Sequence, residues 1–76
     1  MLDWDYRIVY FPNDNYYEVM EVDYDEKGKP TECCDATAVG LTIEETRKEV
    51  AYMERATYLP ILEYKNGKLN EIKNKI

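Results

Sequence analysis

The chain has 76 residues, of which 45% are hydrophobic and 34% charged, and its ten Lys and Arg against sixteen Asp and Glu give a net charge of −6. This length allows one domain, over residues 1–76, with a small core. The sequence contains no His and no Ser, which excludes Ser-His triads, Cys-His dyads and His-ligated metal sites.

No apolar run approaches the roughly 18 to 20 residues that a membrane-spanning helix needs. The N-terminal residues MLDWDYR are acidic and lack the apolar segment of a secretory signal. The two cysteines, Cys33 and Cys34, are adjacent, too close for a disulfide of ordinary geometry and therefore suited to a reducing compartment. We therefore expect a cytoplasmic protein with no membrane contact.

Three strands are predicted in the first half of the chain. Aromatic and β-branched side chains fill residues 6–11, and a Pro-Asn-Asp-Asn turn follows at 12–15. A second strand is predicted over 16–25, and a third, over 31–38, follows a charged turn at 26–29 and Pro30. The short connections favour an antiparallel meander over residues 1–38.

The second predicted strand has one apolar and one acidic face in its later half. Its first half does not keep one parity, and a bulge near Glu18 would restore the alternation. The apolar face carries Met20, Val22 and Tyr24, and the acidic face carries Glu21, Asp23 and Asp25.

A helix is predicted over 42–58. The segment Thr42-Ile43-Glu44-Glu45 forms a capping box, in which the Thr42 hydroxyl accepts an amide and Glu45 reaches back to the Thr42 amide. Pro60 ends the helix. The stripe expected to pack across the meander is Ile43, Thr46, Val50, Met53 and Thr57.

The sequence is compatible with two structures for residues 61–76. Asn66-Gly67 between Leu62–Lys65 and Lys68–Glu71 favours a hairpin with a two-residue turn. The alternative is a short helix after Gly67 with the stripe Leu69, Ile72 and Ile76. The predicted fold class is α+β: a three-stranded antiparallel β meander packed on one α-helix, with a C-terminal β-hairpin or short helix.

The charge is concentrated in the predicted meander. Residues 1–38 carry ten acids and three bases, a net −7, whereas residues 39–76 carry six acids and seven bases, a net +1, and end in a Lys-rich tail. Such an acidic surface repels nucleic acid and attracts basic protein surfaces. Solubility alone is the simpler explanation for the acids. The residues predicted to bind a partner are Tyr17, Glu21, Asp23, Asp25 and Glu26, with Tyr16 and Glu18.

Catalytic and metal-binding motifs are absent from the sequence. The segment from Asp23 resembles the start of a calcium loop, but Lys27 and Cys34 occupy two of the ligand positions. The Cys33-Cys34 pair lacks C-x-x-C spacing and further ligands, and is expected to be two buried small residues on a strand. The three Gly are isolated, so no phosphate-binding loop exists. We expect no enzyme activity, no cofactor and no metal.

Two segments resemble the core of HicB-type antitoxins. They are Asp14-Asn15-Tyr16-Tyr17-Glu18-Val19 and Gly40-Leu41-Thr42-Ile43-Glu44-Glu45, which together cover a strand, a turn and the start of a helix. The stretch between the second strand and the helix is longer than in that family, and its DNA-binding tail is absent. The resemblance implies a β-β-β-α fold that inhibits a basic, RNA-cleaving partner. In length and acidity the chain is also similar to phage anti-CRISPR and anti-restriction inhibitors.

The predicted function is that of a non-catalytic inhibitor that occludes a basic surface of a nucleic-acid-handling protein, such as a nuclease or a CRISPR effector. It would not bind nucleic acid directly. The alternative is a small structural domain that self-associates, for example as a homodimer through an open sheet edge.

Overall fold

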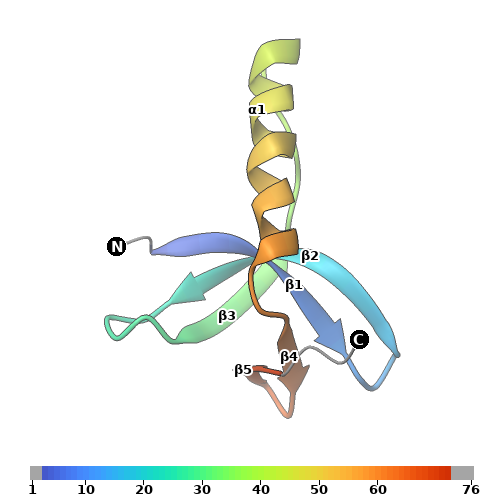
Figure 1. The fold of residues 1–76 in the computed structure, drawn as a ribbon, viewed down its shortest axis with the longest axis vertical. Helices are drawn as coiled ribbons and strands as arrows, with labels where there is room; N and C mark the ends of the chain where they lie inside the picture. The colour runs from blue at the N-terminus through green and yellow to red at the C-terminus, as the bar shows by residue number, and fades with distance from the viewer. Residues whose placement is uncertain (1–2, 73–76) are drawn as a thin grey trace.

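A computed structural model describes residues 3–72, which form a five-stranded sheet and one α-helix followed by a turn of 3₁₀ helix (Figure 1). The α+β class is therefore right. In chain order the elements are β1 (Trp4–Phe11), β2 (Tyr16–Tyr24), β3 (Pro30–Asp35), α1 (Ile43–Glu54), η1 (Arg55–Tyr58), β4 (Leu62–Lys65) and β5 (Lys68–Glu71).

The sheet is mixed, with strand order β3-β2-β1-β4-β5. The first three strands pair antiparallel as expected, but β4 pairs parallel with β1 through Val9↔Leu62 and Tyr10↔Glu63. The prediction of a three-stranded meander with a separate C-terminal element is therefore wrong. The hairpin forms, but as the fourth and fifth strands of the same sheet.

The core lies on one side of this sheet, which we call the inner face. It consists of Val9, Met20, Val22, Leu62 and Leu69, with Phe11, Tyr24 and Cys33 packed against them. The sheet curls around this face so far that β5 contacts β3. The β4–β5 hairpin thus buries the apolar side of β2, which the sequence analysis assigned to the helix.

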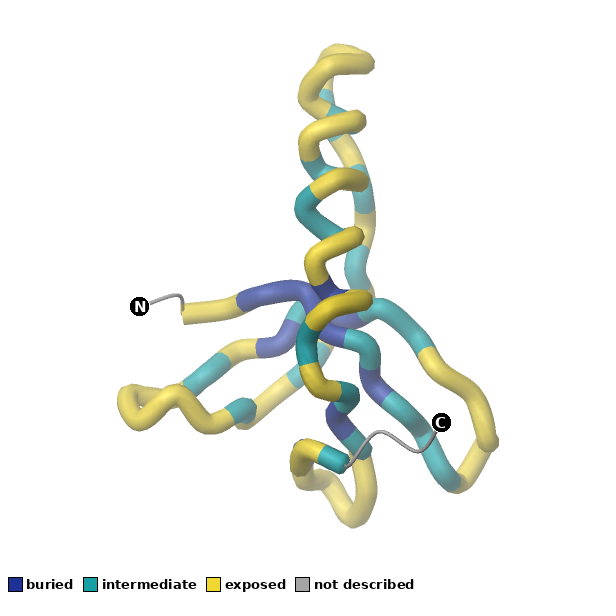
Figure 2. Tube along the Cα trace, in the orientation of Figure 1, coloured by how far each residue is buried: buried dark blue, intermediate teal, exposed yellow. Residues whose placement is uncertain are grey.

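The expectation that the helix packs across the meander is wrong. No residue of α1 is buried, and the predicted stripe residues Ile43 and Val50 are 58% and 53% exposed. The helix rises away from the sheet, with only its C-terminal end against β1 (Figures 1 and 2). The physical reason is that the hairpin already covers the inner face, so the helix contacts the sheet only at the aromatic end of β1 on the opposite face.

The C-terminal end of α1, together with η1, covers the N-terminal half of β1. The strand β4 pairs only with the other half of β1, at Val9 and Tyr10. Trp4 and Tyr6 of β1 contact Tyr52 edge to face, with ring centroids 5.9 and 5.4 Å apart. Ala56 of η1 is fully buried, and the Arg55 guanidinium lies 3.7 Å from the buried Asp5 carboxylate. These contacts position the helix beside the outer face, the side of the sheet opposite the core.

The register of β1 and β2 is continuous from Trp4↔Asp23 to Phe11↔Tyr16, so the predicted bulge near Glu18 is wrong. The irregularity lies between Asp23 and Tyr24, where β2 pairs with β3. The third strand ends at Asp35, three residues earlier than predicted. Because cross-strand partners share a face, this register decides which acids lie on the outer face.

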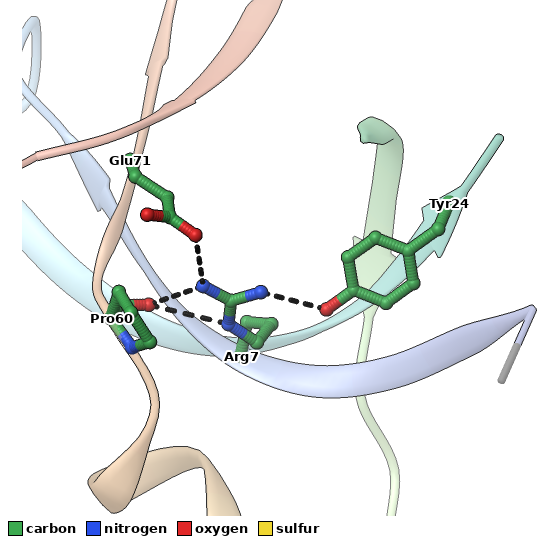
Figure 3. A network of polar contacts seen from close by, with 4 residues as sticks. All are labelled: Arg7, Tyr24, Pro60 and Glu71. Atoms are coloured by element: carbon green, nitrogen blue, oxygen red, sulfur yellow. Dashed lines mark hydrogen bonds and ion pairs between the residues drawn. The ribbon is translucent and has the colours of Figure 1, made fainter. Parts of the chain in front are cut away.

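A buried arginine connects four segments of the chain (Figure 3). Arg7 donates to the Pro60 carbonyl through Nη2 at 2.6 Å and Nε at 3.2 Å, and to the Tyr24 hydroxyl through Nη1 at 2.8 Å. Its Nη2 also lies 3.7 Å from Glu71 Oε2. The guanidinium therefore joins β1 and β2 to the segment before β4 and to β5.

The turn between β4 and β5 confirms the hairpin interpretation. Asn66 has φ 55° and Gly67 has φ 72°, and positive φ at both central residues is the requirement of a type I′ turn. Residues 68–71 are strand rather than helix. The alternative prediction is a short helix with Leu69, Ile72 and Ile76 on one side, and Ile76 lies outside the described residues.

The capping box forms with one change of partner. Thr42 Oγ1 accepts from the Glu45 amide at 3.1 Å as predicted, but Glu45 Oε1 accepts from the Leu41 amide at 2.9 Å instead of the Thr42 amide. The preceding Gly40 lies so close to the helix that an added Cβ would be 2.6 Å from the Glu45 Cβ. The helix is also shorter than predicted, because residues 55–58 are 3₁₀.

Because α1 has no buried side chain, its first turn depends on this cap. We expect Thr42→Ala to destabilise the turn by about 1 kcal/mol, which corresponds to about fivefold faster hydrogen exchange of the Glu45 amide. Thr42→Ser keeps the hydroxyl and is the matched control. Equal exchange rates in wild type and Thr42→Ala would show that the cap does not hold the turn.

Candidate functional site: the acidic outer face

Three of the predicted partner-binding residues lie on the outer face of β2. Tyr17, Glu21 and Asp23 alternate along this side, opposite the core residues Met20 and Val22. The pairing of β2 with β3 adds Cys34 opposite Glu21 and Glu32 opposite Asp23. We call Tyr17, Glu21, Asp23, Glu32 and Cys34 the acidic outer face.

Two acids oppose each other directly on this face. Asp23 and Glu32 are cross-strand partners, and both are exposed. Like charges in this position destabilise a sheet. Residues 3–72 contain two ion pairs, Arg7–Glu71 and Arg55–Asp5, and neither involves this face. The two exposed carboxylates therefore oppose each other without a paired cation in the described part of the chain.

The pKa of the Cys34 thiol is raised in this environment. Partial desolvation raises its pKa, and the carboxylates of Glu21, Asp23, Asp35 and Glu32 raise it further. The expectation that both cysteines are buried is wrong for Cys34, which is exposed, whereas Cys33 packs against the core from the inner face. A raised pKa lowers the fraction of Cys34 that is thiolate at neutral pH.

An aromatic pair continues the acidic outer face toward the β1–β2 turn. The rings of Tyr10 and Tyr17 lie 4.7 Å apart, and the Tyr10 hydroxyl bonds to Asn15 Oδ1 at 3.0 Å. Tyr17 is 61% exposed although its ring is held by this contact. A rigid, exposed Tyr beside carboxylates is suited to anchor a protein partner.

The other four predicted residues lie elsewhere. Tyr16 and Glu18 belong to the inner side of β2, where the Tyr16 ring stacks on Phe11 at 5.0 Å. Asp25 and Glu26 lie in the turn before β3. The Asp25 carboxylate accepts from the amides of Lys27 and Lys29 at 2.9 Å each, so its role in the turn is structural.

Sequence reasoning missed Glu32 as a member of the site. Its charge was counted, but its position opposite Asp23 depends on the register between β2 and β3. The irregularity at Asp23/Tyr24 sets that register, and no local pattern indicates it. Glu63 was missed for a similar reason, because only the parallel pairing of β4 places it beside Tyr10.

Other features of the described residues do not indicate a reaction centre. A cleft of about 300 Å³ between the β2–β3 turn and β5 is lined by Gly28, Lys29, Pro30, Leu69, Asn70 and Glu71. Residues 3–72 contain no group of three or more His, Cys, Asp or Glu side chains placed to hold a metal ion. Within the same range no helix has the length and apolar character to cross a membrane.

Comparisons with protein-family models, curated proteins and solved structures gave no match. The resemblance to the HicB-type antitoxin core therefore stays a prediction.

Proposed function

We propose that this chain is a non-catalytic binding protein whose acidic outer face binds a basic surface of a partner protein. The observation that carries the proposal is the directly opposed pair Asp23 and Glu32, with Glu21 beside it and no ion pair to any of the three among residues 3–72. Solubility requires charge but not like charges placed opposite each other. A partner that supplies Lys or Arg at this position would relieve the repulsion on binding.

The chemistry favours a partner that itself binds nucleic acid. Surfaces that hold phosphates are rich in Lys and Arg, and carboxylates spaced along two strands offer them a competing anionic surface. Tyr17 would supply an apolar anchor inside this charged contact. An inhibitor of a nuclease or a CRISPR effector, or an antitoxin-like protein, fits this description. We place this binding in the cytoplasm, where the free cysteines would stay reduced.

A single charge reversal separates a binding role from a structural one. Asp23→Lys places an opposite charge beside Glu32, so we expect the free energy of unfolding to rise by about 0.2–1 kcal/mol. At low salt, the same variant should bind an arginine-rich peptide about tenfold more weakly than wild type. Calorimetric titration of the peptide and urea unfolding measure the two effects.

Asp14→Lys is the matched control, because it makes the same change in net charge at an exposed turn residue. Peptide binding by this variant should stay within about twofold of wild type. Equal weakening by both variants would show that net charge alone attracts the peptide. Capture from a bacterial lysate with wild type and the Asp23→Lys variant then identifies basic proteins that only the wild type retains.

A further inference from the structure

One side of α1 has no half-buried residue and is exposed along the whole length of the helix. Thr46, Glu49, Tyr52 and Met53 are half-buried. Glu49 and Tyr52 contact Tyr6 of the sheet, and the Thr46 amide lies against Gly40 of the segment that leads into the helix. At about 100° per residue, the opposite side is a separate stripe. We call this stripe the outer helix stripe. It consists of Ile43, Arg47, Val50, Ala51 and Glu54 of α1, all exposed, and we add the exposed Tyr58 of η1, which follows its C-terminal end but is turned from the α-helical line by the tighter 3₁₀ helix.

This outer helix stripe is self-complementary when it is read from its two ends. Its residues fall into three pairs, each symmetric about a point between Val50 and Ala51. The outer pair, Ile43 and Tyr58, is apolar, and so is the central pair. The middle pair, Arg47 and Glu54, has opposite charges. A two-fold axis through that point would therefore bring Arg47 against Glu54 and Val50 against Ala51 of a second copy, and would bring Ile43 beside the η1 segment that carries Tyr58.

We propose that a second copy of this chain docks here, so that two α1 helices pack antiparallel about a two-fold axis between Val50 and Ala51. Arg47 of each copy then meets Glu54 of the other, which makes two equivalent ion pairs. Ile43 of each copy lies beside η1 of the other, where Tyr58 is exposed. Neither Arg47 nor Glu54 has an ion-pair partner among the described residues of its own copy.

The charge distribution selects the antiparallel arrangement. A parallel pair would place Arg47 against Arg47 and would bring the two acidic sheets side by side. The antiparallel pair places the sheets at opposite ends of the helices, because each sheet lies at the C-terminal end of its own helix (Figure 1). Residues 43–58 carry four acids and three bases, so this surface has far less self-repulsion than the −7 of residues 1–38.

The two ends of the contact carry its most exposed apolar side chains. In the antiparallel pair the N-terminal end of α1, where Ile43 is 58% exposed, lies beside η1 of the other copy, where Tyr58 is 81% exposed. The paired segments are about 26 Å long, which is short for a stable interface, so we expect a dimer that dissociates on dilution.

A charge-swap experiment tests the arrangement. By sedimentation equilibrium, wild type should form a dimer at protein concentrations of about 0.1 mM and above. Arg47→Glu and Glu54→Arg should each be monomeric, because each places like charges at both contacts. The double variant R47E/E54R should recover the dimer. An equimolar mixture of the two single variants should form a heterodimer, because both of its contacts are again of opposite sign.

Circular dichroism of each variant shows whether the helix is intact, and both substituted positions are exposed. Three outcomes would overturn the proposal. They are a wild type that stays monomeric over the whole concentration range, single variants that dimerise as well as wild type, and a mixture of the single variants that stays monomeric. Dimerisation through the open edges of β3 or β5 would give the second of these. The Asp23→Lys variant should dimerise like wild type, so this test is independent of the acidic outer face.

Discussion

Replacement of Arg7 by Met is expected to lower the free energy of unfolding by about 3 kcal/mol. The guanidinium is buried and donates to the Pro60 carbonyl and the Tyr24 hydroxyl. Without it, these oxygens lose a charged donor whose own side chain is only 7% exposed. The free energy required to open the β4–β5 hairpin falls as well, because Arg7 joins β1 to the segments on both sides of that hairpin.

Two further variants separate the hydrogen bonds of Arg7 from its ion pair. Arg7→Lys keeps the charge but cannot reproduce the planar fork, so we expect a loss of about 1–2 kcal/mol. Glu71 is largely exposed and 3.7 Å away, so Glu71→Gln should cost less than about 1 kcal/mol. Urea unfolding gives all three values, and Lys65→Met is the surface control. If Glu71→Gln were as destabilising as Arg7→Met, the ion pair and not the hydrogen bonds would hold the hairpin.

Local chemistry explains which parts of the fold the sequence could predict. Asn66-Gly67 predicts its turn because few other residue pairs accept positive φ at two successive positions. Thr42 predicts the helix start because a hydroxyl at that position satisfies an amide that the helix leaves free. The alternation of Met20 and Val22 with Glu21 and Asp23 likewise separates the two faces of β2. In each case the cause and the effect lie within a few residues.

The two wrong predictions that change the architecture, the separate C-terminal hairpin and the helix packed across the meander, concern contacts between distant segments. The parallel pairing of Val9 with Leu62 joins residues 53 positions apart, and no property of either segment alone selects it. Once β4 and β5 cover the inner face, the stripe with Ile43 and Val50 has no sheet to pack on. A helical period shows which side of a helix is apolar, but it does not identify the surface that covers that side.

The candidate site was predicted only in part for the same reason. Glu21 and Asp23 follow from the alternation within one strand. Glu32 belongs to the acidic outer face only because the register of β3 places it opposite Asp23. Asp25 does not belong to this face, because its carboxylate accepts hydrogen bonds within the turn before β3. The buried Arg7 and Asp5 could not be separated from surface charges by sequence, since the groups that surround them come from segments about 50 residues away.

Above pH 10, wild type is expected to lose stability faster than the Tyr6→Phe variant. Tyr6 is buried, and its hydroxyl donates to Glu49 Oε2. Burial raises the pKa of Tyr6 far above 10, and the hydrogen bond and charge of Glu49 and the charge of Glu21 raise it further. In the unfolded chain this hydroxyl has a pKa near 10. The folded state therefore binds more protons than the unfolded state above pH 10.

The sign of the pH dependence follows from this difference. Below about pH 10 the Tyr6 hydroxyl is protonated in both states, and its contribution does not vary with pH. As the pH rises above 10, the unfolded state gains stability by losing this proton, and the free energy of unfolding falls by up to about 1.4 kcal/mol per pH unit. The contribution is fully lost only when the pH exceeds the folded-state pKa.

Tyr6→Phe isolates this effect, because the other tyrosines and both cysteines titrate alike in the two proteins and cancel in the difference. At pH 7 the variant lacks one hydrogen bond and should be less stable by about 1 kcal/mol. Since wild type loses about that much over the first pH unit above 10, the two stabilities should cross near pH 11. Urea unfolding of both proteins between pH 7 and pH 11.5 measures the crossing. A difference that stays constant over this range would show that the Tyr6 hydroxyl ionises in the folded protein as readily as in the unfolded chain.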